Sequence, residues 1–183
     1  MPPGRQSITD VTSDMNTDDI HIRPVDENDL EALNQVIGAA VMTWVLPERV
    51  KRLSLPVYRY TRQDLAHLDM VVARDQQGHV VGVAAWEEAD PKDAPAGRRA
   101  LLLHGIYVDP SLHRQGIGGR LFSAAEVAVS QSQCDGLLVK AQQDATDFFI
   151  SLGMRRLDVD EPLRQYANRL WKDLSQAPSA VCR

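Results

Sequence analysis

The sequence predicts a single α/β domain in which helices cover both faces of a mixed central sheet. Three observations point to this fold class. The chain has 183 residues, 44% of them hydrophobic, which is enough for one core and short for two. Strand-like and helix-like segments alternate along most of the chain. Residues 100–108 (ALLLHGIYV) are apolar almost throughout, as in a central strand covered on both faces.

The first expected elements follow a polar start. Residues 1–19 contain hardly any large apolar side chains, so we expect a disordered leader. Residues 20–25 (IHIRPV) are strand-like, and Asp26 and Asn28 are candidate caps for the helix that follows. The apolar positions of this helix have helical spacing: Leu30, Leu33, Val36, Ile37 and Ala40.

The next segment, residues 44–68, is mixed in character. WVLPERVKRLSL is compatible with a second short helix. Pro56, Tyr58 and Tyr60 indicate an irregular connection after it. We therefore expect one short helix here, followed by a loop.

Two strands are expected in the middle of the chain. Residues 69–75 and 78–88 are strand-like, and the short link between them suits an antiparallel hairpin. A loop rich in Pro, Asp and Gly, residues 89–98, leads to the central strand 100–108. Gly105 lies inside that strand and indicates a bulge or the close approach of another group.

The last third of the chain alternates between helices and strands. A helix ends near Gln131, and a right-handed crossover should place the strand 135–142 parallel to the strand 100–108. Residues 144–153 predict a helix that ends at Gly153. Residues 154–174 predict two strands around Glu161 and Pro162, and we expect a flexible tail over residues 175–183.

Composition excludes several classes of protein. The formal net charge of -5 and a pI near 5.5 argue against a general nucleic-acid binder. Cys134 and Cys182 lie far apart and form no metal-ligand spacing with the five histidines, which predicts a reducing compartment and no metal site. No apolar run approaches the length of a membrane span and the N-terminus lacks a secretory pattern, so we expect a soluble cytoplasmic protein that binds no membrane. The sequence leaves a homodimer open.

A glycine-rich segment, HRQGIGGRLF at residues 113–122, joins the central strand to the following helix. The first turn of a helix has unpaired backbone N–H groups and a positive dipole end, which favours an anion such as phosphate. Gly116 and Gly118 lack a Cβ and let the backbone approach the phosphate oxygens, while Arg114 and Arg120 add positive charge at the rim. The spacing fits neither a Walker A loop nor a Rossmann fingerprint.

The segment instead resembles the acyl-CoA pyrophosphate loop of the GNAT acetyltransferase superfamily, [QR]-x-x-G-x-[GA] after a V-x-P strand end. Here the loop is His113-Arg114-Gln115-Gly116-Ile117-Gly118 after Val108-Asp109-Pro110, with His113 where the family prefers Gln or Arg. The resemblance covers roughly residues 20–174, including the opening IHIRPVDENDLEAL, the hairpin, the parallel pair and the ending FFISLGMRRL with LWKDL. The alternative is a glycine-rich turn that only packs a helix against a sheet.

The resemblance implies direct transfer of an acetyl group from acetyl-CoA, as co-substrate, to an amine in a ternary complex. It assigns the pyrophosphate to the glycine loop and the pantetheine arm to the end of the central strand, where Gly105 would be the bulge that opens the strand. Gln142 stands where many members have an asparagine that binds the CoA arm. The implied cofactor-binding residues are Ile106, Tyr107, Val108, His113, Arg114, Gln115, Gly116, Ile117, Gly118, Gly119, Gln142 and Phe149.

His104 is the candidate general base, because it is the only titratable side chain within LLLHGIYV and an imidazole titrates near neutral pH. The alternative is a buried histidine bonded to a neighbouring strand. Phe149 occupies the position where many members have a tyrosine that protonates the leaving thiolate, and a phenyl ring has no proton to donate. Tyr166 or Tyr107 is then a candidate donor, or the thiolate leaves unassisted.

The acceptor is expected to be a primary amine on a small molecule or a peptide. Four aromatic residues are candidates for its pocket, although partial burial in the core is the alternative for each: Trp44, Tyr58, Tyr60 and Trp86. The acidic stretch Glu87, Glu88, Asp90 can attract a cationic amine or form a solvated loop. Two other functions stay open, an acyl-CoA-binding sensor or pseudoenzyme, and a partner-binding domain with a vacant loop.

Overall fold

The computed structural model describes residues 19–159 and 166–175, and it confirms a single α/β domain built on one seven-stranded sheet. The strand order is β1-β2-β3-β4-β5-β7-β6. Neighbouring strands are antiparallel except β4 and β5, which are parallel as predicted. The expected leader and tail lie outside the described residues, apart from Asp19 and Ser175.

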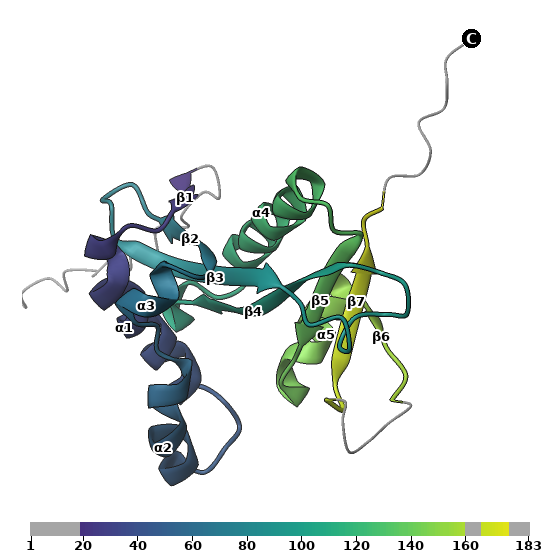
Figure 1. The fold of residues 1–183 in the computed structure, drawn as a ribbon. Coiled ribbons are helices and arrows are strands. Elements are labelled where there is room, and N and C mark those ends of the chain that lie inside the picture. Colours follow the sequence, from purple (N-terminus) through teal and green to yellow (C-terminus); the bar gives the residue numbers. More distant parts are fainter. Residues whose placement is uncertain (1–18, 160–165, 176–183) are drawn as a thin grey trace, which may run out of the picture.

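Figure 1 shows the order of the elements along the chain. The strands are β1 His21–Pro24, β2 Asp69–Arg74, β3 Val80–Glu88, β4 Ala100–Val108, β5 Gly136–Lys140, β6 Arg155–Arg156 and β7 Arg169–Asp173. The α-helices are α1 Leu30–Met42, α2 Glu48–Tyr58, α3 Arg62–Leu65, α4 Ile117–Gln131 and α5 Thr146–Ser151. Short 3-10 turns are η2 Glu27–Asp29, η3 Pro110–Leu112 and η4 Gln143–Ala145.

The sheet separates two hydrophobic layers. On one face, α1 buries Leu33, Ile37 and Val41 against Val83 and Ala85 of β3. On the other face, α4 buries its apolar stripe against the alternate positions of the same strand, because successive side chains of a strand point to opposite faces. Helices on both faces of a mixed sheet are therefore confirmed.

The start of α1 is fixed by a buried carboxylate. Asp26 caps the turn as predicted, accepting from the Asn28 amide at 2.8 Å, whereas Asn28 lies inside the turn and is not a cap. Asp29 is fully buried and bonds to Arg23 at 2.8 Å and to Arg74. Burial raises the pKa of Asp29, but hydrogen bonds from the Asp26 amide and the two arginines outweigh this and hold the pKa below its usual value.

The segment after α1 differs from the prediction. α2 continues through Pro56 to Tyr58, so Tyr58 belongs to the helix and not to an irregular connection. Pro56 is tolerated because it lies in the last turn, where a missing N–H removes a single bond and the Arg59 amide still donates to Leu55 O at 3.2 Å. α2 extends away from the sheet, and α3 then leads back to β2 (Figure 1).

The expected β-hairpin and the expected strand–helix–strand crossover are both present. β2 and β3 pair antiparallel, but their link runs from Asp75 to His79 and is longer than predicted. α4 connects β4 to the parallel strand β5. The two strands expected in the last part of the chain are present as β6 and β7, which pair antiparallel, while Glu161 and Pro162 lie between the described ranges.

In the part of the chain that the structure describes, no helix combines the length and the apolar character needed to cross a membrane. The same residues contain no cluster of three or more His, Cys, Asp or Glu side chains placed to hold a metal ion.

Gly153 ends the last helical segment in a conformation that favours glycine, with a φ of +86°. We expect Gly153→Ala to lower the free energy of unfolding by about 1–2 kcal/mol, because a Cβ is strained in the left-handed region. Gly38→Ala is the matched control, since Gly38 lies inside α1 and an added Cβ would meet only Leu55 at 3.9 Å. The control should gain about 0.5–1 kcal/mol, measured by urea unfolding, and equal effects of both changes would contradict the expectation.

Candidate functional site

His104 is the extra residue of a β-bulge in β4. Ala85 of β3 pairs with Gly105 and Trp86 pairs with Leu103, so His104 has no partner residue of its own in β3. The sequence placed the bulge at Gly105, and the structure places the extra residue one position earlier. The bulge directs the His104 side chain outward, where it is 33% exposed. It is therefore not the buried core histidine of the alternative interpretation.

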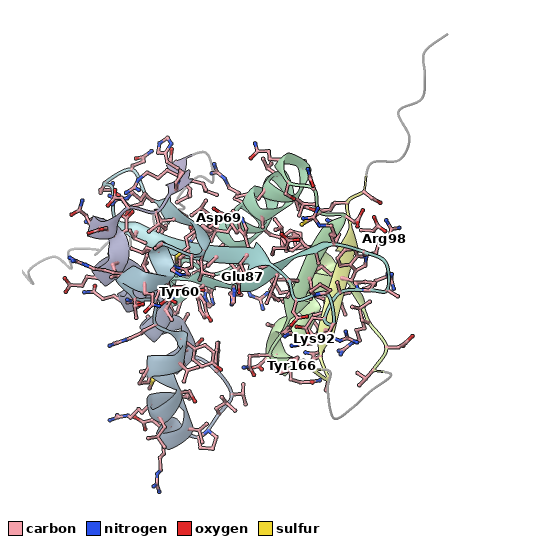
Figure 2. All side chains as sticks on the ribbon, in the orientation of Figure 1. Tyr60, Asp69, Glu87, Lys92, Arg98 and Tyr166 are labelled. Atoms are coloured by element: carbon pink, nitrogen blue, oxygen red, sulfur yellow. The ribbon has the colours of Figure 1, made fainter. Side chains whose placement is uncertain are left out.

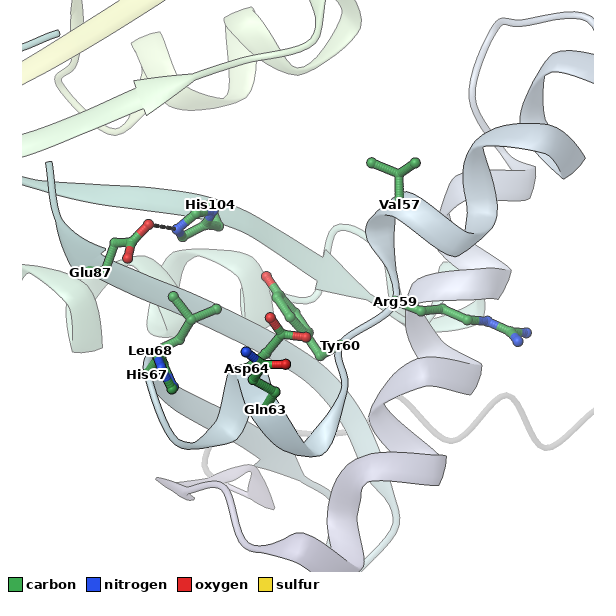
Figure 3. Close-up of a pocket in the computed structure, with 9 residues that line it drawn as sticks. All are labelled: Val57, Arg59, Tyr60, Gln63, Asp64, His67, Leu68, Glu87 and His104. Atoms are coloured by element: carbon green, nitrogen blue, oxygen red, sulfur yellow. Dashed lines mark hydrogen bonds and ion pairs between the residues drawn. The ribbon is translucent and has the colours of Figure 1, made fainter. Parts of the chain in front are cut away.

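His104 is held by a carboxylate from the neighbouring strand. Its Nε2 lies 2.8 Å from Oε1 of Glu87 on β3, and Figure 3 shows the two side chains meeting above the sheet. A carboxylate only accepts hydrogen bonds, so the shared proton lies on Nε2 when the imidazole is neutral. The lone pair is then on Nδ1, which is the atom able to take up a proton.

A pocket of about 340 Å³ opens beside this pair. It is bounded by the end of α2, the link to α3, α3 itself, and β3 and β4. Figure 3 shows Tyr60 and Asp64 directed toward the His104 side, with Arg59 directed away. The lining residues are Val57, Arg59, Tyr60, Gln63, Asp64, His67, Leu68, Glu87 and His104.

Asp64 and Tyr60 give this pocket its charge and its shape. Hydrogen bonds from Thr61 lower the pKa of Asp64, and His104 and His67 lower it further, so Asp64 is ionised at neutral pH. Burial raises the pKa of Tyr60, which keeps its phenol neutral. The backbone of Tyr60 is fixed by Asn34 of α1, whose amide accepts from Tyr60 N at 2.9 Å and donates to Tyr60 O at 2.8 Å.

The edge of β4 beyond His104 is open. β5 pairs with β4 only over Ala100–Leu103, and among the described residues no strand continues that edge along Gly105–Val108. The Asp109 amide donates to Val81 O of β3, so by strand alternation the amides of Ile106 and Val108 point to the open edge. An extended ligand can add there as an extra strand. The prediction placed Ile106, Tyr107 and Val108 along such a ligand, but by the same alternation the Tyr107 amide points to β3 and not to the open edge.

The glycine loop follows this edge directly. Gly116 caps α4 with a φ of +78° and no side chain caps the helix, so the first-turn N–H groups are not satisfied by a capping side chain. Arg114 also has a positive φ, 64°, a strained conformation for a non-glycine residue that is typical of ligand sites. The backbone therefore offers a cradle for an anion at the N-terminus of a 15-residue helix.

The remaining loop residues surround that cradle unevenly. A Cβ on Gly119 would meet nothing within 4 Å, whereas a Cβ on Gly118 would lie 3.0 Å from the ring of Phe148. His113 does not face the loop: its Nε2 donates to the carbonyl of Val108 at 3.1 Å, on the open edge of β4. Gln115 is half-buried and its Oε1 has no hydrogen-bond partner. Ile117 is buried in the core below the loop.

Phe149 is buried, and its neighbour is at the surface. The Phe149 ring is 4% exposed and packs on Phe122 and Phe148, with ring centroids 6.2 and 5.1 Å apart. Phe148 is 38% exposed and lies against Gly118. The structure thus places Phe148, which the sequence analysis did not single out, beside the loop. Contact of Phe149 with a ligand stays a prediction.

Gln142 reaches across to α2. Its Nε2 donates to the hydroxyl of Tyr58 at 3.1 Å, and the Tyr58 ring stacks edge-on against Trp44 with centroids 4.9 Å apart. Contact of Gln142 with the CoA arm is not tested by this arrangement.

The two tyrosines considered as proton donors lie elsewhere. The ring of Tyr107 fills the space that the missing Cβ of Gly105 leaves, and burial raises its pKa. Tyr166 is 42% exposed and lies on the β5–β7 side of the molecule, whereas Tyr60 and Glu87 lie at the pocket (Figure 2).

The pocket brings together residues that the sequence analysis weighed separately or missed. Glu87 faces His104, while the other two acidic residues of its stretch pair with cations, Glu88 with Arg99 and Asp90 with Lys92. Of the four candidate aromatic residues, Tyr60 lines the pocket and Trp86 is buried in the core. Asp64 was missed, although Thr61-x-x-Asp64 is a capping-box pattern that could have located α3.

A family model described as acetyltransferase (GNAT) domain matches residues 66–155, which include β4, the glycine loop and α5. A search among curated proteins found no match.

Solved structures share the fold at low sequence identity. PaiA N-acetyltransferase from Thermoplasma acidophilum in complex with coenzyme A has a TM-score of 0.67 at 15% identity, covering 84% of this chain and 98% of that one. A GNAT-family acetyltransferase from Staphylococcus aureus Mu50 has a TM-score of 0.63 at 15% identity, covering 85% and 99%. AtaTR bound with acetyl-CoA has a TM-score of 0.59 at 20% identity, covering 86% and 94%.

Proposed function

Because the chain belongs to the GNAT acetyltransferase superfamily, we propose that it transfers an acetyl group from acetyl-CoA to a primary amine by direct attack in a ternary complex. One observation carries this proposal. The His104–Glu87 pair lies at the bulge immediately before the open edge of β4, and both residues line the pocket described above. A base, an edge for an extended ligand and an anion cradle therefore follow one another along the chain.

Coenzyme A would supply the activated acetyl group as a thioester, and the residues present fit it. The amides of Ile106 and Val108 would hold the pantetheine arm along the open edge. The N–H groups of the loop, residues 113–119, would hold the pyrophosphate at the start of α4. Gly119 has no side chain, and the open space beside it leaves room for the pyrophosphate oxygens.

His104 would act on the acceptor amine. The ammonium ion first loses one proton to solvent. The nitrogen of the neutral amine then attacks the thioester carbonyl, and Nδ1 of His104 takes the proton that the nitrogen loses as the amide forms. Glu87 fixes the imidazole through Nε2, 2.8 Å away, and places a carboxylate beside the imidazolium that forms. The pair also sets which ring nitrogen is the base.

The acceptor would enter by the pocket beside His104. An amine arrives mainly as an ammonium ion, and Asp64 and Glu87 give the pocket two carboxylates to attract it. Val57 and Leu68 offer apolar contacts for the rest of the acceptor. These features favour a primary amine with an apolar stem near the nitrogen.

A CoA-binding and acetyl-transfer experiment tests the proposal. At a CoA concentration about 100 times its dissociation constant, we expect the free energy of unfolding to rise by about 2.7 kcal/mol, measured by thermal shift. With acetyl-CoA and a panel of primary amines, free thiol should be released together with acetylated amine. Absence of acetyl transfer to every amine of the panel would overturn the proposal, whether or not CoA stabilises the protein.

A second candidate is an acyl-CoA-binding sensor or pseudoenzyme, which the phenylalanine at position 149 favours because it supplies no proton. This candidate gives CoA stabilisation without release of thiol on any amine. The intact His104–Glu87 pair argues for the transferase, since a sensor does not need a base beside its pocket.

A further inference from the structure

A tyrosine that the sequence did not identify as a proton donor lies within hydrogen-bond distance of a residue just after β5. Tyr58, at the end of α2, accepts a hydrogen bond from Gln142 Nε2 at 3.1 Å. Gln142 follows β5 by two residues, on the side where β4 has lost its partner strand. A second link, from the Val45 amide to Asp144 Oδ2 at 3.4 Å, joins the same two regions. Tyr58 is therefore placed at the opening between β4 and β5.

β4, on the other side of this opening, also lies close to Tyr58. Tyr107, on β4, and Tyr58 pack against the same buried hydrophobic cluster, and the Tyr58 phenol adds to the rise in the pKa of Tyr107 that burial causes. Tyr58 thus has Gln142 on the β5 side and Tyr107 on the β4 side. The pantetheine arm, bound along Ile106 and Val108, would bring its thioester toward this opening.

The hydrogen bonding of Tyr58 leaves its proton available. Its oxygen accepts from Gln142, and among the described residues no acceptor for the Tyr58 hydroxyl proton is present. The Gln142 N–H would also stabilise the phenolate that forms when that proton leaves. Trp44, stacked edge-on against the ring, fixes the direction of the hydroxyl.

Resting on the proposed function, we propose that Tyr58 is the proton donor to the leaving CoA thiolate, with Gln142 and Trp44 as its positioning residues. This assignment supplies the donor that Phe149 cannot be. In this assignment the acid comes from α2 and not from the helix after β5.

The proposed step balances with acetyl-CoA and the amine alone. The C–S bond breaks and its electron pair goes to sulfur, while the Tyr58 O–H bond breaks and its proton goes to the same sulfur. The products are the acetylated amine, CoA thiol, a Tyr58 phenolate and the protonated His104. The phenolate then regains a proton from solvent and His104 releases one, which restores the starting enzyme.

Tyr58→Phe in the full chain tests the assignment, because it removes the hydroxyl and keeps the ring against Trp44. We expect kcat for acetyl transfer to fall about 10- to 100-fold, with the KM for acetyl-CoA within about twofold. We expect kcat of the unchanged protein to fall at high pH, because a donor must be protonated, and this fall should be absent from the variant, which has no donor. Tyr166→Phe is the matched control and should keep kcat within about twofold.

Three results would overturn the assignment. The first is a kcat of Tyr58→Phe within about twofold of that of the unchanged protein. The second is an equal loss in Tyr166→Phe. The third is a lower CoA affinity together with a lower melting temperature, large enough to explain the reduced kcat. That pattern is expected of a residue with a structural role. No acetyl transfer by the unchanged protein would overturn the proposed function and this assignment together, whereas the three results above leave the proposed function standing.

Discussion

Replacing His104 with alanine is expected to lower kcat for acetyl transfer by about 100-fold or more, the usual contribution of a general base. The affinity for CoA should stay within about twofold, because the loop and the open edge do not depend on this side chain. The kcat/KM of the unchanged protein should fall on the acid side, where the imidazole gains a proton and can no longer accept one from the amine. This acid limb should be absent in the variant, as measured by thiol release across pH.

Two further variants separate chemistry from packing. Glu87→Gln keeps a hydrogen-bond partner for His104 but removes the charge that stabilises the imidazolium, so we expect a smaller loss, about tenfold. His79→Ala is the matched control, because His79 forms a similar pair with Asp75, 3.1 Å apart, in the turn between β2 and β3. The control should match the unchanged protein. A His104→Ala variant that retains its rate and pH profile would exclude His104 as the base.

The parts of the site that come from one continuous segment could be predicted from the sequence. The central strand, its bulge and the glycine loop lie within residues 100–119, so their order is fixed by the chain itself. Apolar character identifies the strand, and glycines at short spacing identify the turn. The sequence also predicted the parallel strand β5, because a strand, helix and strand in succession form a crossover.

The pocket beside His104 could not be predicted in the same way. Tyr60 and Asp64 come from the stretch after α2 and Glu87 comes from β3, and only the folded chain brings these two segments together. In the sequence each of the three is an ordinary polar or aromatic residue. The Glu87 contact depends on the one-residue bulge in β4, because a bulge changes which side chains face each other across the strands. A one-residue shift in the register of two strands cannot be recognised from composition or periodicity.

α2 shows why local rules missed Tyr58. Pro56 usually marks the end of a helix, and the prediction placed the following residues in a connection. In the structure Pro56 lies within the last turn, and Tyr58 completes the helix in contact with Trp44 and Gln142. The stacking and the hydrogen bond, 14 and 84 residues away in the sequence, stabilise an end that proline alone disfavours. Tertiary contacts here override a local signal.

Gly119→Glu is expected to weaken CoA binding strongly while leaving the fold intact. A Cβ on Gly119 meets nothing within 4 Å, so the substitution is not strained. Gly119 lies in the first turn of α4, where a carboxylate favours the helix, so the melting temperature without ligand should stay the same or rise. The same carboxylate would repel a bound pyrophosphate by about 2–4 kcal/mol, which raises the dissociation constant of CoA by about 30-fold or more.

Gly119→Gln is the matched control, because glutamine has the size of glutamate without its charge. If the loop holds the pyrophosphate, the neutral variant should bind CoA within about fivefold of the unchanged protein, and the difference between the two variants should shrink as salt is added. Calorimetric titration with CoA measures both constants. Equal affinities for the glutamate and glutamine variants would show that no anion binds at the start of α4. A negative charge at position 119 lowers the affinity for CoA only if a CoA phosphate binds nearby.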